Sequence, residues 1–126
     1  FKEAEAHDGP SIIIAYSHCI AHGMKEIKDG LEQQKLAVNS GHWILFRRDP
    51  ALAAQGKNPL QLDSKAATIA LKDYIYNETR YKMLLKSDPA TAAKLLEEAQ
   101  AAIGKKWAQY AKMADVPVAA AAAPKA

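Results

Sequence analysis

The chain has 126 residues and a formal net charge of +3, and its composition, 49% hydrophobic and 25% charged, suits one soluble domain or part of a larger one. Its single cysteine excludes an internal disulfide framework and a metal site built only from its own cysteines. Basic and acidic residues are interspersed, no apolar run approaches the roughly 20 residues that span a bilayer, and no secretory signal opens the sequence, so we expect a cytoplasmic protein that binds neither nucleic acid nor membrane.

The first half of the chain predicts two strands separated by a helix. Residues 1–7 are good helix formers, and the Asp-Gly-Pro sequence that follows ends them. Residues 12–16 form an apolar, β-branched run without charge, the pattern of a strand that is buried on both faces of a parallel sheet. A helix is predicted over 31–39, with Gly41 at its carboxyl end, and a second strand over 42–47. Because two short strands are marginally stable alone, we expect polypeptide outside this chain to cover the isoleucines of the first strand.

The second half of the chain predicts a loop followed by two helices. Proline, glycine and asparagine punctuate residues 48–63, which predicts an ordered loop. Apolar residues recur at helical spacing over 74–85, and Asp73 can cap the start of this helix. A longer apolar stripe begins at Asp88-Pro89, a cap followed by proline at the first helical position. The short connection predicts an antiparallel hairpin of these helices, and the Ala/Pro-rich residues 116–126 predict a flexible tail.

Residues 17–23 hold the single cysteine and two of the four histidines, directly after the predicted buried strand. In open α/β sheets, ligands bind beyond the carboxyl ends of the strands, which is where this stretch is expected. One possible role of Cys19 is to ligate a metal ion, with His18 and His22 as further ligands or as donors to the ligands. The other is nucleophilic catalysis by Cys19 with a histidine as the base. Neighbouring residues on a strand point to opposite faces, so Cys19 and His18 do not easily share one ligand sphere. From the spacing alone, a small buried apolar cysteine without chemistry is the commoner outcome.

Three blocks of sequence, in order along the chain, resemble the pyruvate:ferredoxin (flavodoxin) oxidoreductases. Residues 8–23, Asp-Gly-Pro-Ser-Ile-Ile-Ile-Ala-Tyr-Ser-His-Cys-Ile-Ala-His-Gly, resemble a late core strand of that family and the turn after it. Residues 37–47, Ala-Val-Asn-Ser-Gly-His-Trp-Ile-Leu-Phe-Arg, are similar to a segment that ends in Gly-Tyr-Trp-Pro-Leu-Tyr-Arg, and residues 55–65 resemble the loop that follows it. The chain departs from the family pattern at three positions, where the family has tyrosine, proline and tyrosine: His42, Ile44 and Phe46.

The resemblance implies an α/β fold, the C-terminal portion of a thiamine diphosphate-binding domain. Residues 1–72 then form the end of that domain, residues 73–115 form a helical hairpin packed on it, and residues 116–126 form the tail. The implied function is part of an enzyme that converts pyruvate and coenzyme A to acetyl-CoA. Such an enzyme passes the electrons through 4Fe-4S clusters to ferredoxin or flavodoxin.

By the same resemblance, Cys19 matches the isolated cysteine that completes the ligand set of the 4Fe-4S cluster nearest the thiamine diphosphate. The other three cysteines, and the residues that bind thiamine diphosphate and Mg²⁺, are expected upstream of this chain. The backbone N–H groups of residues 20–23 are expected to hydrogen-bond cluster sulfurs. No catalytic residue falls within the chain, which we expect to be inactive alone.

The expected partners are the remainder of the same polypeptide and a second copy in a homodimer. The alternative is a freestanding interaction module without catalysis, in which the helical hairpin is the functional part.

Overall fold

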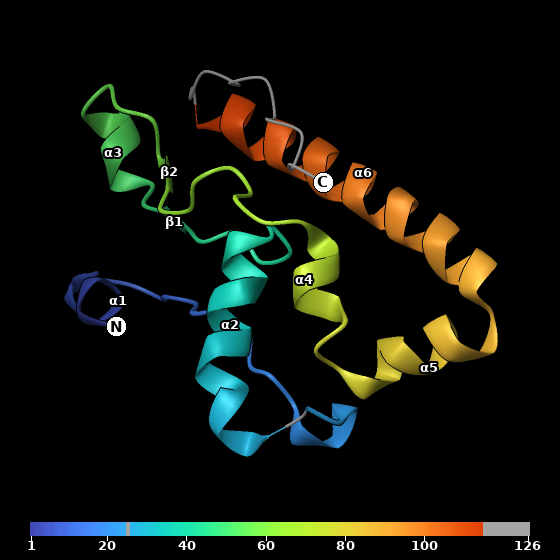
Figure 1. Ribbon diagram of the computed structural model, residues 1–126. Coiled ribbons are helices and arrows are strands. Elements are labelled where there is room, and N and C mark those ends of the chain that lie inside the picture. Colours follow the sequence, from blue (N-terminus) through green and yellow to red (C-terminus); the bar gives the residue numbers. More distant parts are fainter. Residues whose placement is uncertain (25, 115–126) are drawn as a thin grey trace.

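The computed structural model describes residues 1–24 and 26–114, and this part of the chain is mostly helical (Figure 1). Its elements in chain order are α1 (Lys2–Ala6), the 3₁₀ turns η1 (Ile20–His22) and η2 (Ile27–Asp29), α2 (Gly30–Asn39), β1 (Phe46–Arg48), α3 (Ala51–Ala54), β2 (Leu60–Leu62), α4 (Leu71–Ile75), α5 (Thr79–Ser87) and α6 (Pro89–Met113). None of these helices is both long and apolar enough to cross a membrane. The tail predicted over 116–126 lies outside the described residues.

The core lies where α4 packs between α2 and α6 (Figure 1). Its buried apolar residues come from all three helices: Ala37, Leu71, Tyr74, Ile75 and Ile103. Burying each of the larger side chains contributes about 1.5–3 kcal/mol. The three helices therefore form one packed unit, and α2 and the end of α4 are fixed surfaces against which other segments of the chain can pack.

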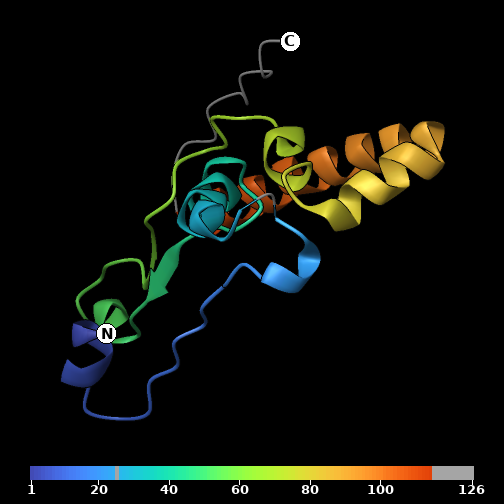
Figure 2. The same cartoon turned by 60° about the horizontal axis from the view of Figure 1, so that its bottom comes forward.

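Three of the predicted helices are confirmed, as α1, α2 and α6. Asp88 is the N-cap of α6, and its Oδ1 accepts a hydrogen bond from Thr91 N at 3.0 Å, with Pro89 in the first turn. Hydrogen bonding by Thr91 holds the pKa of the Asp88 carboxyl below its ordinary value. After α2, Gly41 has a φ of +75°, the left-handed conformation that commonly ends a helix. The α5 helix packs against α6 after the chain reverses at Asp88 (Figure 2).

The single helix predicted over 74–85 is wrong, because the chain forms two shorter helices there, α4 and α5. Between them, Glu78 has an extended backbone (φ −102°, ψ 134°) and forms an isolated antiparallel bridge with Met24. Asp73, the predicted cap, lies inside α4, whose N-cap is Ala70. The break is made by pairing with a segment far away in the sequence, which local spacing does not reveal.

The buried strand predicted over 12–16 is also wrong for this chain. The segment runs between α1 and η1 without strand pairing, clear of the other elements in Figure 2, and Ile12, Ile13 and Ile14 are 87%, 50% and 74% exposed. A strand needs a neighbour, and the one sheet in the described part of the chain consists of β1 and β2 alone. The expectation that this chain does not itself cover these isoleucines is confirmed.

The sheet is small and antiparallel. Its register pairs Phe46 with Leu62, Arg47 with Gln61 and Arg48 with Leu60. The strand predicted over 42–47 is thus shifted toward its carboxyl end, and the predicted loop over 48–63 contains α3 and β2. Helices with a small sheet are compatible with a fragment of an α/β fold, although the described residues show no parallel sheet.

Candidate functional site

Cys19 is a free, exposed cysteine at the N-cap of the turn η1. The turn is closed by hydrogen bonds from His22 N to Cys19 O (3.1 Å) and from Gly23 N to Ile20 O (3.0 Å). Gly23 ends the turn with a φ of +73°, a conformation that glycine adopts without strain. The interpretation of Cys19 as a buried apolar residue is therefore wrong for this chain, and its thiol is accessible to a ligand.

His18 lies against the first residue of α2 and does not join Cys19 in a common site. A Cβ added to Gly30 would lie 2.3 Å from His18 Nε2, so the ring occupies the space that the glycine leaves open. The other ring nitrogen, Nδ1, is buried and has no hydrogen-bond partner among the described residues. In the same part of the chain, no hydrogen bond links the Cys19 thiol to a histidine, so the nucleophile and base pair is not assembled here.

His22 lies beside a buried carboxylate that the sequence pattern does not single out. Its Nδ1 is 3.8 Å from Oε2 of Glu78, whose side chain is 1% exposed. Arg80 Nε donates to the same oxygen at 2.6 Å, and Gln33 Nε2 donates to Oε1 at 3.1 Å. The carboxylate thus accepts hydrogen bonds from one side chain of α2 and one of α5, and it lies beside the imidazole of the turn.

Two further contacts join the turn to the start of α5. Thr79 N and Thr79 Oγ1 donate to Gly23 O, at 2.9 Å and 2.6 Å. A Cβ on Gly23 would lie 2.6 Å from Thr79 Cβ, so this close approach requires glycine. Met24 follows and pairs with Glu78. The Asn-Glu-Thr sequence at 77–79 contains residue types typical of helix starts, and it is the one sequence signal that points to this docking site.

The residues of the candidate metal site are not brought together. Among the residues that the structure describes, no three His, Cys, Asp or Glu side chains are grouped so that they could hold a metal ion. A 4Fe-4S cluster takes four cysteine thiolates, and this chain offers the accessible thiol of Cys19. The donor set therefore fits such a cluster as the source of one ligand. Of the four N–H groups expected to face the cluster, those of His22 and Gly23 donate within the turn instead.

Aromatic residues hold the end of the exposed segment against the core. The hydroxyl groups of Tyr16 and Tyr74 are hydrogen-bonded, and the Tyr16 ring stacks on Trp43 with ring centres 5.3 Å apart. The His42 ring centre lies 4.9 Å from that of Tyr74. Burial, and then the charge of Lys106, lowers the pKa of His42, and burial raises the pKa of Tyr74. The chain therefore enters the Cys19 stretch from a residue that is fixed to the core.

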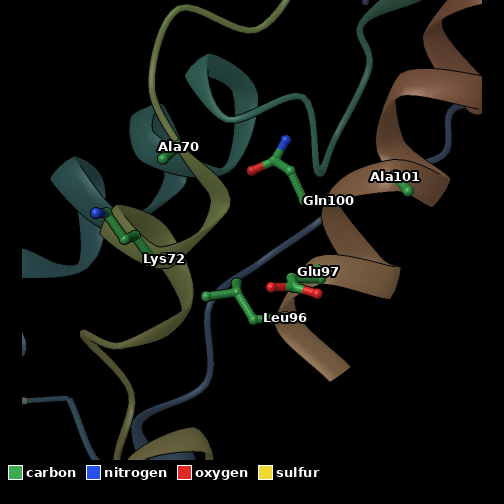
Figure 3. Close-up of a pocket in the computed structure, with 6 residues that line it drawn as sticks. All are labelled: Ala70, Lys72, Leu96, Glu97, Gln100 and Ala101. Carbon is green, nitrogen blue, oxygen red and sulfur yellow. The ribbon is translucent and has the colours of Figure 1, made fainter. Parts of the chain in front are cut away.

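Among the cavities formed by the described residues, two lie between helices, and neither of these is lined by residues 17–23. The first, about 460 Å³, is drawn in Figure 3 with its lining residues: Ala70, Lys72, Leu96, Glu97, Gln100 and Ala101. Gln100 Oε1 accepts a hydrogen bond from Leu71 N at 2.8 Å, so its polar side chain caps α4. The second, about 400 Å³, has mostly apolar walls from α4, α5 and α6 together with His42. Both are separate from the surroundings of Cys19.

The known proteins to which this chain is similar are much longer than the chain itself. No known protein-family profile matches it. It is 54% identical over 114 residues, 90% of the chain and 9% of the relative, to a protein of Nostoc sp. named pyruvate-flavodoxin oxidoreductase. The chain is homologous to a segment of the pyruvate-flavodoxin oxidoreductases.

Relatives with related names extend this similarity to other organisms. Pyruvate:ferredoxin oxidoreductase of Moorella thermoacetica is 43% identical over 113 residues, 90% of the chain and 10% of the relative. The mitochondrial pyruvate dehydrogenase [NADP(+)] of Euglena gracilis is 39% identical over 125 residues, 98% of the chain and 7% of the relative. The chain thus spans a tenth or less of the length of each of these three relatives.

Proposed function

We propose that the chain is the C-terminal segment of a pyruvate:ferredoxin or pyruvate:flavodoxin oxidoreductase. The observation that carries this proposal is 54% identity across 90% of the chain to only 9% of a relative with that name. The complete enzyme would oxidise pyruvate, with coenzyme A, to acetyl-CoA, and would reduce ferredoxin or flavodoxin. The chain alone would be inactive. The freestanding interaction module has less support, because the relatives are about ten times longer than the chain.

Within that enzyme, Cys19 is the residue that we assign to a cofactor, as one thiolate ligand of a 4Fe-4S cluster. The assignment is supported by its exposure and by its place in the stretch that resembles the family. When bound, such a cluster accepts and releases single electrons. Thiamine diphosphate and Mg²⁺ would be held mainly by the part of the polypeptide upstream of Phe1, as would the other three cysteine ligands.

The remainder of the same polypeptide is the partner that we propose for residues 12–16. Their isoleucines are exposed in this chain, and burial of each would contribute about 1.5–3 kcal/mol. In the complete enzyme the segment would be a strand of the thiamine diphosphate-binding domain, which would end near residue 72, with residues 73–115 packed on it. A homodimer in the cytoplasm is the assembly that we expect.

The test of the Cys19 assignment is its replacement by alanine in the complete natural polypeptide that carries this sequence. We expect Cys19→Ala to lose about four iron atoms and the matching acid-labile sulfide per chain, because the cluster loses a ligand. Ser17→Ala, two residues earlier and also exposed, is the matched control and should keep its iron. Unchanged iron and sulfide in the Cys19 variant would remove this residue from the ligand set.

A further inference from the structure

The turn that carries Cys19 is docked on the break between α4 and α5, and one buried carboxylate stands at the centre of that contact. We propose that Glu78 is a positioning residue that fixes the turn and thereby sets where the Cys19 thiolate lies. The first part of this proposal, that Glu78 fixes the turn, follows from contacts within this chain. Its consequence for a cluster rests on the proposed function.

The first step is the backbone of Glu78. Apolar spacing favours a helix through this position, yet the residue is extended and pairs with Met24 instead. Glu78 N still donates locally, to Ile75 O at 3.1 Å, but the N–H of the next residue is directed to the turn. Thr79, the next residue, donates two hydrogen bonds to Gly23 O. The break in the helix is therefore the surface on which the turn is held.

The second step is the charge of Glu78. A carboxylate that is 1% exposed is costly unless it is paired and hydrogen-bonded. Arg80 Nε supplies the opposite charge at 2.6 Å, and its guanidinium lies 4.6 Å from the centre of the Tyr81 ring. Gln33 Nε2 donates to the other oxygen, while Gln33 Oε1 accepts from Asn77 Nδ2 at 3.2 Å. The carboxylate is thus held from two sides by groups that do not belong to the turn.

The third step connects the carboxylate to Cys19. His22 Nδ1 is 3.8 Å from Glu78 Oε2, and His22 N donates to Cys19 O within the same turn. On the other side of Cys19, the His18 ring lies against Gly30 of α2. The cysteine is therefore held through its neighbours on both sides while its thiol stays exposed. This arrangement fixes the position of a thiolate without covering it.

The experiment uses the complete natural polypeptide with Glu78→Gln, and with Glu98→Gln on the exposed surface of α6 as the matched control. Removing one partner of a buried charge pair is strongly destabilising locally. We therefore expect the amide hydrogens of His22 and Gly23, which are hydrogen-bonded within the turn, to exchange about tenfold faster or more in Glu78→Gln. The reduction potential or electron paramagnetic resonance spectrum of the cluster should also change, which a merely structural contact elsewhere would not cause. The control should show neither effect.

A second variant keeps the test decisive if Glu78→Gln does not fold. Thr79→Val removes the Oγ1 hydrogen bond to Gly23 O and leaves the buried charges in place. We expect a smaller acceleration of exchange, about two- to tenfold, in the same residues. Unchanged exchange in the folded variants would overturn the proposal. Where Cys19→Ala loses its iron, faster exchange with an unaltered cluster signal would also overturn the proposal, because the thiolate position would then not depend on Glu78.

These outcomes are distinct from failure of the proposed function. If Cys19→Ala retains its iron, Cys19 is not a ligand, and that result appears in iron content rather than in hydrogen exchange. Faster exchange of the His22 and Gly23 amides in Glu78→Gln would in that case still support the anchoring of the turn.

Discussion

Tyr74 and Glu78 are both fully buried and lie four residues apart, and each brings a polar group that needs a partner. The Tyr74 hydroxyl is hydrogen-bonded to Tyr16, just before the Cys19 stretch, and the Glu78 carboxylate lies beside His22, just after Cys19. Gln33 Nε2 donates to both Tyr74 O and Glu78 Oε1, each at 3.1 Å. Two residues of one segment therefore hold both ends of the stretch that carries the thiol.

The hydroxyl pair gives a prediction at this scale. Tyr16→Phe should destabilise the chain by about 1–3 kcal/mol, because it leaves the Tyr74 hydroxyl buried without that partner. Tyr74→Phe should cost less, because the Tyr16 hydroxyl is in a half-buried residue that water can reach. Urea unfolding of the two single variants and the double variant should give a coupling of about 1 kcal/mol. A coupling near zero would show that the bond does not contribute to stability.

Among the elements, those specified by neighbouring residues are the ones that the sequence predicts correctly. The α6 helix has its cap and proline at Asp88-Pro89 and a long apolar stripe, and α2 ends before Gly41. The break between α4 and α5 depends on Met24, which is more than fifty residues away, and therefore leaves little trace in local spacing. The same holds for the candidate site. Cys19 stands out in the sequence, whereas the partners Gln33 and Glu78 become visible only when the helices pack.

The cap of α6 gives a prediction at the scale of an element. Hydrogen bonding by Thr91 lowers the pKa of Asp88 from its ordinary value of 3.8, so the ionised carboxylate stabilises the folded chain. This contribution is fully present above the unfolded pKa and is lost as the pH falls through the lower, folded pKa. Asp88→Ala should therefore lower the melting temperature at about pH 7 and have a smaller effect at about pH 2. Asp88→Asn, which keeps a capping oxygen, should be the milder change, and equal effects of Asp88→Ala at both pH values would contradict a role of the charge.

At the scale of the whole molecule, the chain is well packed at its helical end and uncovered at its start. The core joins α2, α4 and α6, while residues 12–16 lie outside it with their isoleucines exposed. The apolar run is a correct signal of a buried strand only if the neighbouring strands are present, and the described residues do not supply them. The absence of this strand from the described residues is therefore consistent with the relatives being about ten times longer than this chain.

This difference gives a prediction that compares two contexts. The double substitution Ile12→Ser and Ile14→Ser should change the free energy of unfolding of the 126-residue chain by less than about 0.5 kcal/mol, because both side chains are exposed there. In the complete natural polypeptide, the same change should cost about 2–5 kcal/mol, because the proposed function places these side chains in a core there. Denaturant unfolding monitored by limited proteolysis measures both. Equal effects in the two contexts would contradict burial by the remainder of the polypeptide.

The unpaired run at residues 12–16 also bears on how the isolated chain behaves during preparation. An apolar, unpaired segment presents N–H and C=O groups to which another molecule can add as a neighbouring strand. The 126-residue chain would therefore tend to self-associate through this segment as its concentration rises. Under the proposed function, producing the segment within the complete natural polypeptide, instead of by itself, is the route to material that stays in solution.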